Sequence, residues 1–170
     1  MPHKFLPSSR HVFLDLQNIL LFGGLDDTHS DMEPFFTNYC YKLSLVNRSF
    51  NEQLYVCHSR SAMTYSRGDF AICHNNGFVF IFGGSINVSH NQSPFTVSCE
   101  KYDIQEDEWY VIADMPIPLR NSTACSVSAD SIYIFGGETV DQIDLKLESK
   151  IVPKKSQVIL QYVVAANIWL

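Results

Sequence analysis

The chain has 170 residues, 46% hydrophobic and 18% charged, which is long enough for one globular domain with a sizeable core and too apolar for a disordered protein. Its formal net charge of −6 argues against nucleic acid as a partner, because binding through phosphates requires a basic surface. Residues 1–7 lack the apolar core of a signal peptide, and no apolar run is long enough to span a membrane, so no membrane partner is expected.

A short apolar segment that ends in two glycines occurs three times, at residues 19–24, 78–84 and 132–137. Each segment is rich in aliphatic and aromatic residues and is too short for an ordinary helix, which predicts a buried strand. The glycines let the backbone turn where a Cβ would obstruct it. The first glycines of the pairs are 60 and 53 residues apart, a periodicity typical of repeat architectures. The pairs are Gly23–Gly24, Gly83–Gly84 and Gly136–Gly137.

A second apolar segment precedes each glycine-ended segment, at residues 12–14, 70–73 and 124–127, and turn-forming residues separate the two. Two strands joined by a tight hairpin fit this pattern, and Asn76-Gly77 is the strongest of its turn signals. One arginine lies upstream of each glycine pair, at 13, 16 and 16 residues before the first glycine. These are Arg10, Arg67 and Arg120.

A polar, irregular segment follows each glycine pair, at residues 25–37, 85–95 and 138–156, and two further strands follow it. In the second copy these strands contain Tyr102 and Trp109, which are seven residues apart. Tyr162 and Trp169 repeat this spacing in the third copy, and Leu43 and Phe50 stand at the same spacing in the first. The repeating unit is therefore predicted to be four antiparallel strands over about 55 residues, with large side chains packed against the neighbouring unit.

This pattern resembles the kelch repeat, in which an arginine after a methionine or proline precedes an aliphatic strand, a second strand ends in Gly-Gly, and a tyrosine and a tryptophan follow. The second copy is complete, at Met63, Arg67, Gly83, Gly84, Tyr102 and Trp109. The first copy departs at its aromatic pair, and the third carries an insertion at about 138–156. The resemblance implies an all-β fold, a partial kelch-type β-propeller of about three four-stranded antiparallel blades in an open arc.

The resemblance makes the whole chain, 1–170, one kelch-repeat domain. Its blades are expected at about 10–58, 67–114 and 120–170, the last one incomplete at Leu170. Propellers close with about four to eight blades, so three blades leave an apolar face exposed at each end. We favour a fragment of a larger propeller over a ring completed by self-association or by another chain.

Strand alternation places the segments after the glycines on one face of the arc, beside the segments that end at the arginines. Long polar loops on a rigid scaffold are where binding usually occurs, although solvated loops without a ligand remain an alternative. The candidate binding residues on this face are Asp26, Asp27, His29, Asp31, Asn87, His90, Asn91 and Glu138. For Arg67 and Arg120 the resemblance implies a structural role, in which they satisfy backbone carbonyls or pack between blades.

Cys57-His58 and Cys73-His74 together offer four nitrogen and sulfur ligands for zinc. The strand assignment places Cys57 in an outermost strand and Cys73 in an innermost one, so no metal site is expected. Cys40, Cys73, Cys99 and Cys125 all fall in predicted strands, where a free cysteine behaves as a small apolar residue. No nucleophile elbow and no cofactor fingerprint occurs, so we expect no catalytic residue and no cofactor.

The resemblance implies a non-catalytic protein–protein interaction module that presents its long loops to a protein partner, as a substrate adaptor or scaffold. The adaptor version needs a helical docking domain, and no helical-period segment provides one here. The alternative is a fragment of a kelch-like propeller enzyme that acts on a sugar or another small molecule. A cytoplasmic location is expected, with secretion as the alternative because four glycosylation sequons begin at Asn47, Asn87, Asn91 and Asn121.

Overall fold

A computed structural model describes residues 6–27, 33–49, 52–87, 94–140 and 153–170 of the chain. Every regular element in these ranges is a β-strand. No helix that could cross a membrane was found in these ranges. The predicted all-β fold is confirmed.

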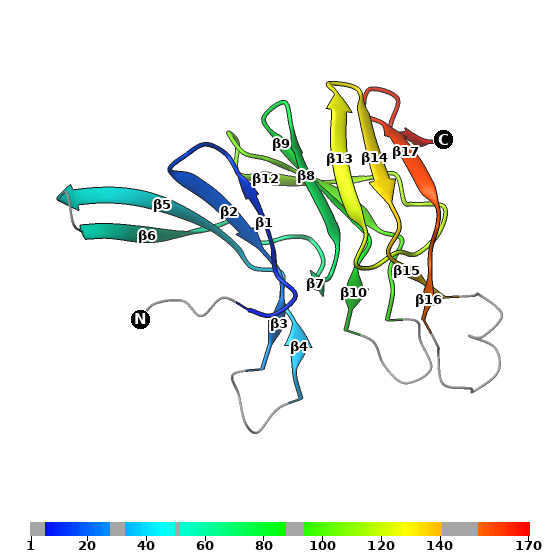
Figure 1. The fold of residues 1–170 in the computed structure, drawn as a ribbon, viewed down its shortest axis with the longest axis horizontal. Helices are drawn as coiled ribbons and strands as arrows, with labels where there is room; N and C mark the ends of the chain where they lie inside the picture. Colours follow the sequence, from blue (N-terminus) through cyan, green and yellow to red (C-terminus); the bar gives the residue numbers. More distant parts are fainter. Residues whose placement is uncertain (1–5, 28–32, 50–51, 88–93, 141–152) are drawn as a thin grey trace.

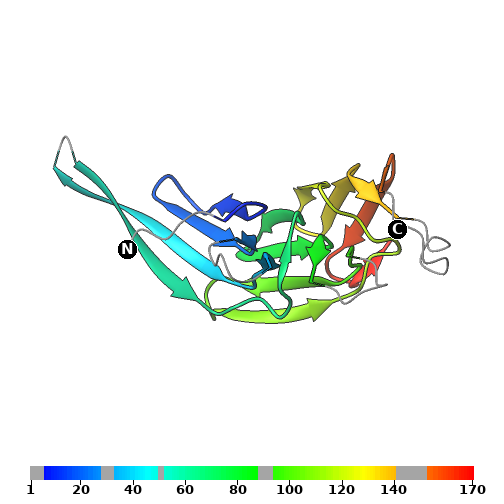
Figure 2. The ribbon, with the colours of Figure 1, turned by 90° about the horizontal axis from the view of Figure 1, so that it is seen from below.

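Three four-stranded antiparallel sheets, which we call blades 1 to 3, stand side by side in an open arc (Figure 1). Blade 1 contains β1 (Arg10–Phe13), β2 (Asn18–Phe22), β5 (Cys40–Ser49) and β6 (Glu52–Arg60). Blade 2 contains β8 (Ala71–Asn75), β9 (Phe78–Phe82), β11 (Cys99–Asp103) and β12 (Glu108–Ile112). Blade 3 contains β13 (Thr123–Ser128), β14 (Ser131–Phe135), β17 (Ile159–Val163) and β18 (Ile168–Trp169). Figure 2 shows the arc from below.

Three short two-stranded ladders each contain the first two residues of a segment that follows a glycine pair. The ladders pair β3 (Leu25–Asp26) with β4 (Phe35–Phe36), β7 (Arg67–Gly68) with β10 (Ser85–Ile86), and β15 (Glu138–Thr139) with β16 (Lys154–Lys155). The expectation that these segments are irregular from their first residue is therefore wrong. All three ladders project from the same side of the arc, opposite the β1–β2, β8–β9 and β13–β14 turns (Figure 1).

The glycine pairs are the places where the backbones of adjacent blades meet. Gly24 N donates to Arg67 O at 3.1 Å, and Gly84 N donates to Leu119 O at 2.8 Å. Gly84 has φ of 101°, and a Cβ there would stand 2.5 Å from Gly68 O. A side chain is therefore excluded both by the left-handed backbone and by the closeness of β7, which enters the same blade.

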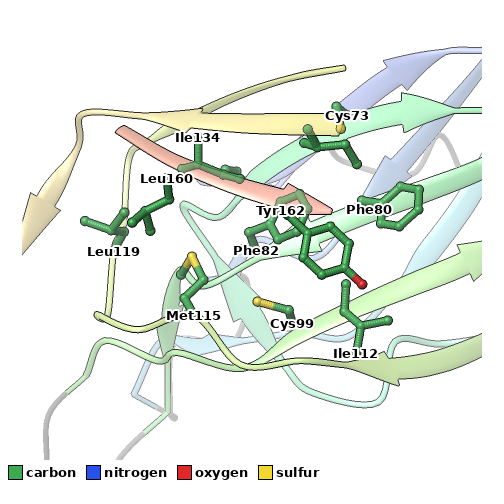
Figure 3. Close-up of a cluster of buried hydrophobic side chains, with 12 residues drawn as sticks. Cys73, Phe80, Phe82, Cys99, Ile112, Met115, Leu119, Ile134, Leu160 and Tyr162 are labelled. Atoms are coloured by element: carbon green, nitrogen blue, oxygen red, sulfur yellow. The ribbon is translucent and has the colours of Figure 1, made fainter. Parts of the chain in front are cut away.

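The core lies between the blades and is built on their aromatic residues. Tyr102 and Trp109 of blade 2 pack against Phe22 of blade 1, with ring centroids 6.1 and 5.8 Å away. Tyr162 and Trp169 of blade 3 pack in the same way against Phe82 of blade 2, at 5.8 and 5.4 Å. Figure 3 shows Tyr162 and Phe82. The two tryptophans also bond to backbone of the preceding blade, Trp109 Nε1 to Ser61 O and Trp169 Nε1 to Ala113 O, at 2.8 and 2.9 Å.

Blade 1 departs from this arrangement in its outer hairpin. β5 and β6 have ten and nine residues, whereas β11 and β12 have five each. Cys57 pairs with Leu43 in this hairpin, as Trp109 pairs with Tyr102 in blade 2. The prediction that Phe50 takes the place of the tryptophan is wrong, because the longer hairpin breaks the seven-residue spacing.

Candidate functional site

The candidate site is the side of the arc from which the three ladders project, and we call this side the loop face. It is formed by the ladders β3–β4, β7–β10 and β15–β16 together with the residues that adjoin them. Each ladder continues the turn made by a glycine pair, so the strand positions of the blades fix where each loop begins.

Four of the eight predicted binding residues are in the described part of the chain. Asp26 lies on β3 opposite Phe35, Asp27 follows it, Asn87 follows β10, and Glu138 begins β15. All four are thus on the loop face. The other four, His29, Asp31, His90 and Asn91, lie outside the described residues.

The Asn87 side chain joins the loop bases of blades 1 and 2. Its Oδ1 accepts a hydrogen bond from Phe36 N at 2.7 Å, and its Nδ2 donates one to Phe36 O at 2.8 Å. The amide therefore satisfies both backbone groups of Phe36, as a neighbouring strand would do. Asn87 thus has an intramolecular role that the sequence did not predict.

Arg120 joins the loop bases of blades 2 and 3. Its Nε and Nη2 approach Glu138 Oε2 at 2.9 and 2.8 Å, and its guanidinium carbon lies 4.4 Å from the centre of the Phe95 ring. Ion pairing and cation–π stacking hold the same guanidinium from two sides. Glu138, a second predicted binding residue, is therefore already paired within the protein.

Arg120 and Arg67 do not occupy equivalent positions, although both lie 16 residues before a glycine pair. Strand pairing sets Gly68 opposite Ser85 and Arg120 opposite Glu138. A bulge between Ser126 and Ser128 in β13 adds one residue to the third hairpin and shifts the count. The equivalence predicted from spacing is wrong by one residue, so Arg120 takes the place of Gly68.

Gly68 and Arg120 hold equivalent positions at the two boundaries between blades, but they contact an aromatic ring in different ways. At Gly68 the Phe36 ring lies so close that a Cβ would meet Phe36 Cε1 at 2.6 Å. At the next boundary the Arg120 guanidinium covers the Phe95 ring. Each boundary thus places an aromatic ring from one loop base against the strand that enters the next blade.

Arg67 is a fully buried structural residue. Its Nη1 donates to Gly83 O and Ser98 O, both at 2.8 Å, and its Nη2 donates to Ser98 Oγ at 2.8 Å. Glu100, which is also fully buried, approaches Arg67 Nη2 at 3.4 Å and accepts a hydrogen bond from Thr64 N. Burial lowers the pKa of the guanidinium, against the opposing effect of Glu100. These contacts hold the first turn after β9 in place.

A polar cluster along the innermost strands was not found from the sequence. Arg10 Nη2 donates to Asn121 Oδ1 at 3.2 Å and lies 3.8 Å from Asp69 Oδ1, so it connects all three blades. Ser8, Asp69 and Asn121 all have left-handed φ, between 52° and 60°. Backbone bonds run from Asn121 N to Asp69 O and from Asp69 N to Ser8 O. The unusual position of Arg10, 13 residues before its glycine, was the one signal of this cluster.

The cysteines lie in the blades. Burial raises the pKa of the Cys73 and Cys99 thiols to about 12, and Cys40 is buried as well. Cys125 is exposed, which corrects the expectation that it is buried, because its side of blade 3 has no neighbouring blade. In the ranges that the structure covers, no three His, Cys, Asp or Glu side chains converge as metal ligands.

Comparison with known proteins gives matches along the chain. Residues 66–116 match the Kelch motif. Protein C13 of swinepox virus (strain Kasza) is 34% identical over 76 residues, which are 45% of this chain and 15% of that protein. Kelch repeat and BTB domain-containing protein 2 of cowpox virus (strain GRI-90 / Grishak) is 25% identical over 161 residues, which are 89% of this chain and 25% of that protein.

The solved structure of YjhT superposes on 99% of this chain with a TM-score of 0.65 and 14% sequence identity, and the match covers 51% of the YjhT chain. This likeness concerns the fold. The present chain spans a quarter or less of the length of the two viral relatives and about half of YjhT. The kelch motif at residues 66–116, the kelch-named relative and the three antiparallel blades packed through their aromatic residues together support a relationship to the kelch-repeat family.

Proposed function

We propose that this chain is a non-catalytic protein–protein interaction module that binds a protein partner on its loop face. The observation that carries the proposal is the joining of the loop bases across blades, by Asn87 to Phe36 and by Arg120 to Phe95. Because each loop base is bonded to the base of the neighbouring loop, the three loops all start from one rigid set of strands. A rigid support reduces the ordering cost of binding, which favours recognition of another macromolecule.

The charges on the loop bases support a partner segment that lies across the arc. Asp26 and Asp27 are at the blade 1 end, and Lys154 and Lys155 are at the blade 3 end. A segment with basic residues toward blade 1 and acidic residues toward blade 3 would complement this distribution. Such complementarity sets the orientation and the rate of association more than the affinity.

An adaptor or scaffold role in the cytoplasm is the finer form of the proposal. The name of the cowpox relative combines kelch repeats with a BTB domain, and its match covers 89% of this chain, which supports a similar association. The cytoplasmic location has support at one sequon, because a glycan would attach at Asn87 Nδ2, the atom that donates to Phe36 O.

Photo-crosslinking tests the choice of face. A photoreactive residue is placed at Asp27 on the loop face or, as a control, at Gln105 in the β11–β12 turn of the opposite face. The partner is identified from the product specific to position 27, purified, and measured for affinity. We expect the combined substitution Asp27→Lys and His90→Ala to weaken binding at least about tenfold. This corresponds to a loss of about 1.4 kcal/mol in binding free energy. Unchanged affinity, or loss with Gln105→Lys alone, would contradict the proposal.

A further inference from the structure

The outer face of blade 3 is an apolar surface with no neighbour in the described structure. Strand pairing places Phe135 between Thr123 and Ile159, and Tyr133 beside Cys125. Phe135 is 40% exposed and Ile159 is 63% exposed, whereas Ile134 and Leu160, the next residues along their strands, are buried. We call Thr123, Cys125, Tyr133, Phe135 and Ile159 the blade 3 end face.

This end face repeats, position by position, the face of blade 2 that receives blade 3. In blade 2, Phe82 lies between Ala71 and Cys99, and Phe80 lies beside Cys73.

The stacked rings on the two faces agree in geometry as well. The ring centroids of Phe80 and Phe82 are 6.3 Å apart with an interplanar angle of 11°, and those of Tyr133 and Phe135 are 6.2 Å apart with an interplanar angle of 21°. Because the blade 2 face holds Tyr162 and Trp169, the blade 3 end face has the form of a receiving surface for another blade.

At the opposite end of the arc, blade 1 has an unpartnered face of the other kind. It is the face that in blades 2 and 3 carries the tyrosine and tryptophan packed against the preceding blade. Blade 1 has Leu43 paired with Ile19 and Cys57, where blade 2 has Tyr102 paired with Val79 and Trp109. Leu21 likewise stands where blade 2 has Ile81. We call Ile19, Leu21, Leu43 and Cys57 the blade 1 end face. Its two central side chains are much smaller than the tyrosine and tryptophan at both internal boundaries.

The receiving end face differs in the compensating direction. Cys40 and Cys99 hold equivalent positions in blades 1 and 2, paired with Phe22 and Phe82. Each cysteine shares a buried cluster with the inserted tyrosine, Tyr102 or Tyr162, and Figure 3 shows Cys99 beside Tyr162. In blade 3 this position is Ile159.

The blade 3 end face thus has a larger residue, Ile159, where blades 1 and 2 have a cysteine. The blade 1 end face has smaller residues, Leu43 and Cys57, where blades 2 and 3 have a tyrosine and a tryptophan. Close packing requires this kind of matched volume.

We propose that two copies of this chain join head to tail, with blade 3 of each copy packed on blade 1 of the other in a six-bladed ring. Two arcs of three blades fall within the four to eight blades of closed propellers. One two-fold rotation covers all four end faces, so the assembly closes instead of growing. The match of this chain to about half of YjhT gives the same size for the complete ring.

The mass of the purified 170-residue chain in solution tests the proposal, measured by sedimentation over about a hundredfold range of concentration. We expect a dimer, and we expect Ile159→Lys and Leu43→Glu each to give a monomer with an unchanged circular dichroism spectrum. The matched control is Val111→Lys, because Val111 is 56% exposed on β12 of the middle blade and lies on neither end face. That variant should remain a dimer.

Mixing the two monomeric variants identifies the arrangement. A head-to-tail pair of Ile159→Lys with Leu43→Glu has one boundary without substitutions and one that joins opposite charges, so the mixture should form a heterodimer. A wild-type chain that is monomeric at all concentrations would overturn the proposal. A dimer that Leu43→Glu leaves intact would also overturn it, since that result would mean that two blade 3 faces meet each other. Assemblies larger than a dimer would show that the ring does not close and would overturn it as well.

Discussion

Arg67 and Arg120 show how much the role of a side chain depends on its burial. Arg67 is completely enclosed and bonds to two backbone carbonyls, whereas Arg120 is partly exposed and bonds to Glu138 at the loop face. The motif around Arg67 was enough to predict a structural arginine in the second copy. The sequence could not distinguish the position of Arg120, because the extra bulged residue in β13 gives Arg120 the same 16-residue spacing to its glycine pair that Arg67 has.

Replacing the two arginines should have very different effects on stability. Arg67→Ala leaves the buried Glu100 carboxylate without its counter-charge, so we expect a loss of about 3–5 kcal/mol in the free energy of unfolding. Arg120→Ala removes an exposed pair and should cost about 1 kcal/mol or less. Urea unfolding followed by circular dichroism measures both. Equal losses would contradict the structural role given to Arg67.

At the scale of elements, hairpin turns and strand lengths decide which residues meet. The Asn76-Gly77 turn was predictable, and both residues have the left-handed φ of a tight two-residue turn, 49° and 79°. The length of the β5–β6 hairpin was not predictable, because the regular seven-residue spacing of the other copies concealed it. The ladders at the loop bases were missed because two-residue strands carry no periodic signal.

Two glycines with left-handed backbone provide a matched test of the contact between blades. Gly77→Ala meets no atom within 4 Å and should cost only the left-handed strain, about 1–2 kcal/mol. Gly83→Ala brings a Cβ within 2.5 Å of Leu119 O, in the segment that enters blade 3, and should cost clearly more, because blades 2 and 3 must separate to accommodate it. Thermal unfolding of both variants gives the comparison. A Gly83→Ala variant as stable as Gly77→Ala would show that this contact yields easily.

For the whole molecule, the arrangement of three blades followed from the repeat, because the glycines and the aromatic pairs recur at positions that only stacked sheets can use. The joining of the loop bases did not follow, since Asn87 and Phe36 are 51 residues apart and belong to different copies. The candidate binding face was therefore predictable as a location. The pairing of Asn87 and Glu138 within the protein depends on contacts between blades that spacing does not encode.

Phe82 and Phe135 occupy equivalent positions at an internal boundary and at an end face. Phe82→Ala should lower the free energy of unfolding by about 3–5 kcal/mol, because Phe82 is fully buried beneath Tyr162 and Trp169. In the Leu43→Glu background, where self-association is removed, Phe135→Ala should cost about 1 kcal/mol or less, because its ring is 40% exposed. Denaturant titration measures both losses. Comparable losses would mean that the Phe135 ring is already buried within a single arc.

The indole contacts give the molecule two built-in optical reporters. The chain has two tryptophans, and Trp109 is bonded to Ser61 O on the blade 1 side while Trp169 is bonded to Ala113 O on the blade 2 side. Each indole therefore becomes solvated when the boundary between its own blade and the preceding blade opens. The Trp169→Phe variant keeps only Trp109 and reports on the boundary between blades 1 and 2, and the Trp109→Phe variant keeps only Trp169 and reports on the boundary between blades 2 and 3. Fluorescence emission spectra of the two variants would show whether the three blades separate together or one at a time.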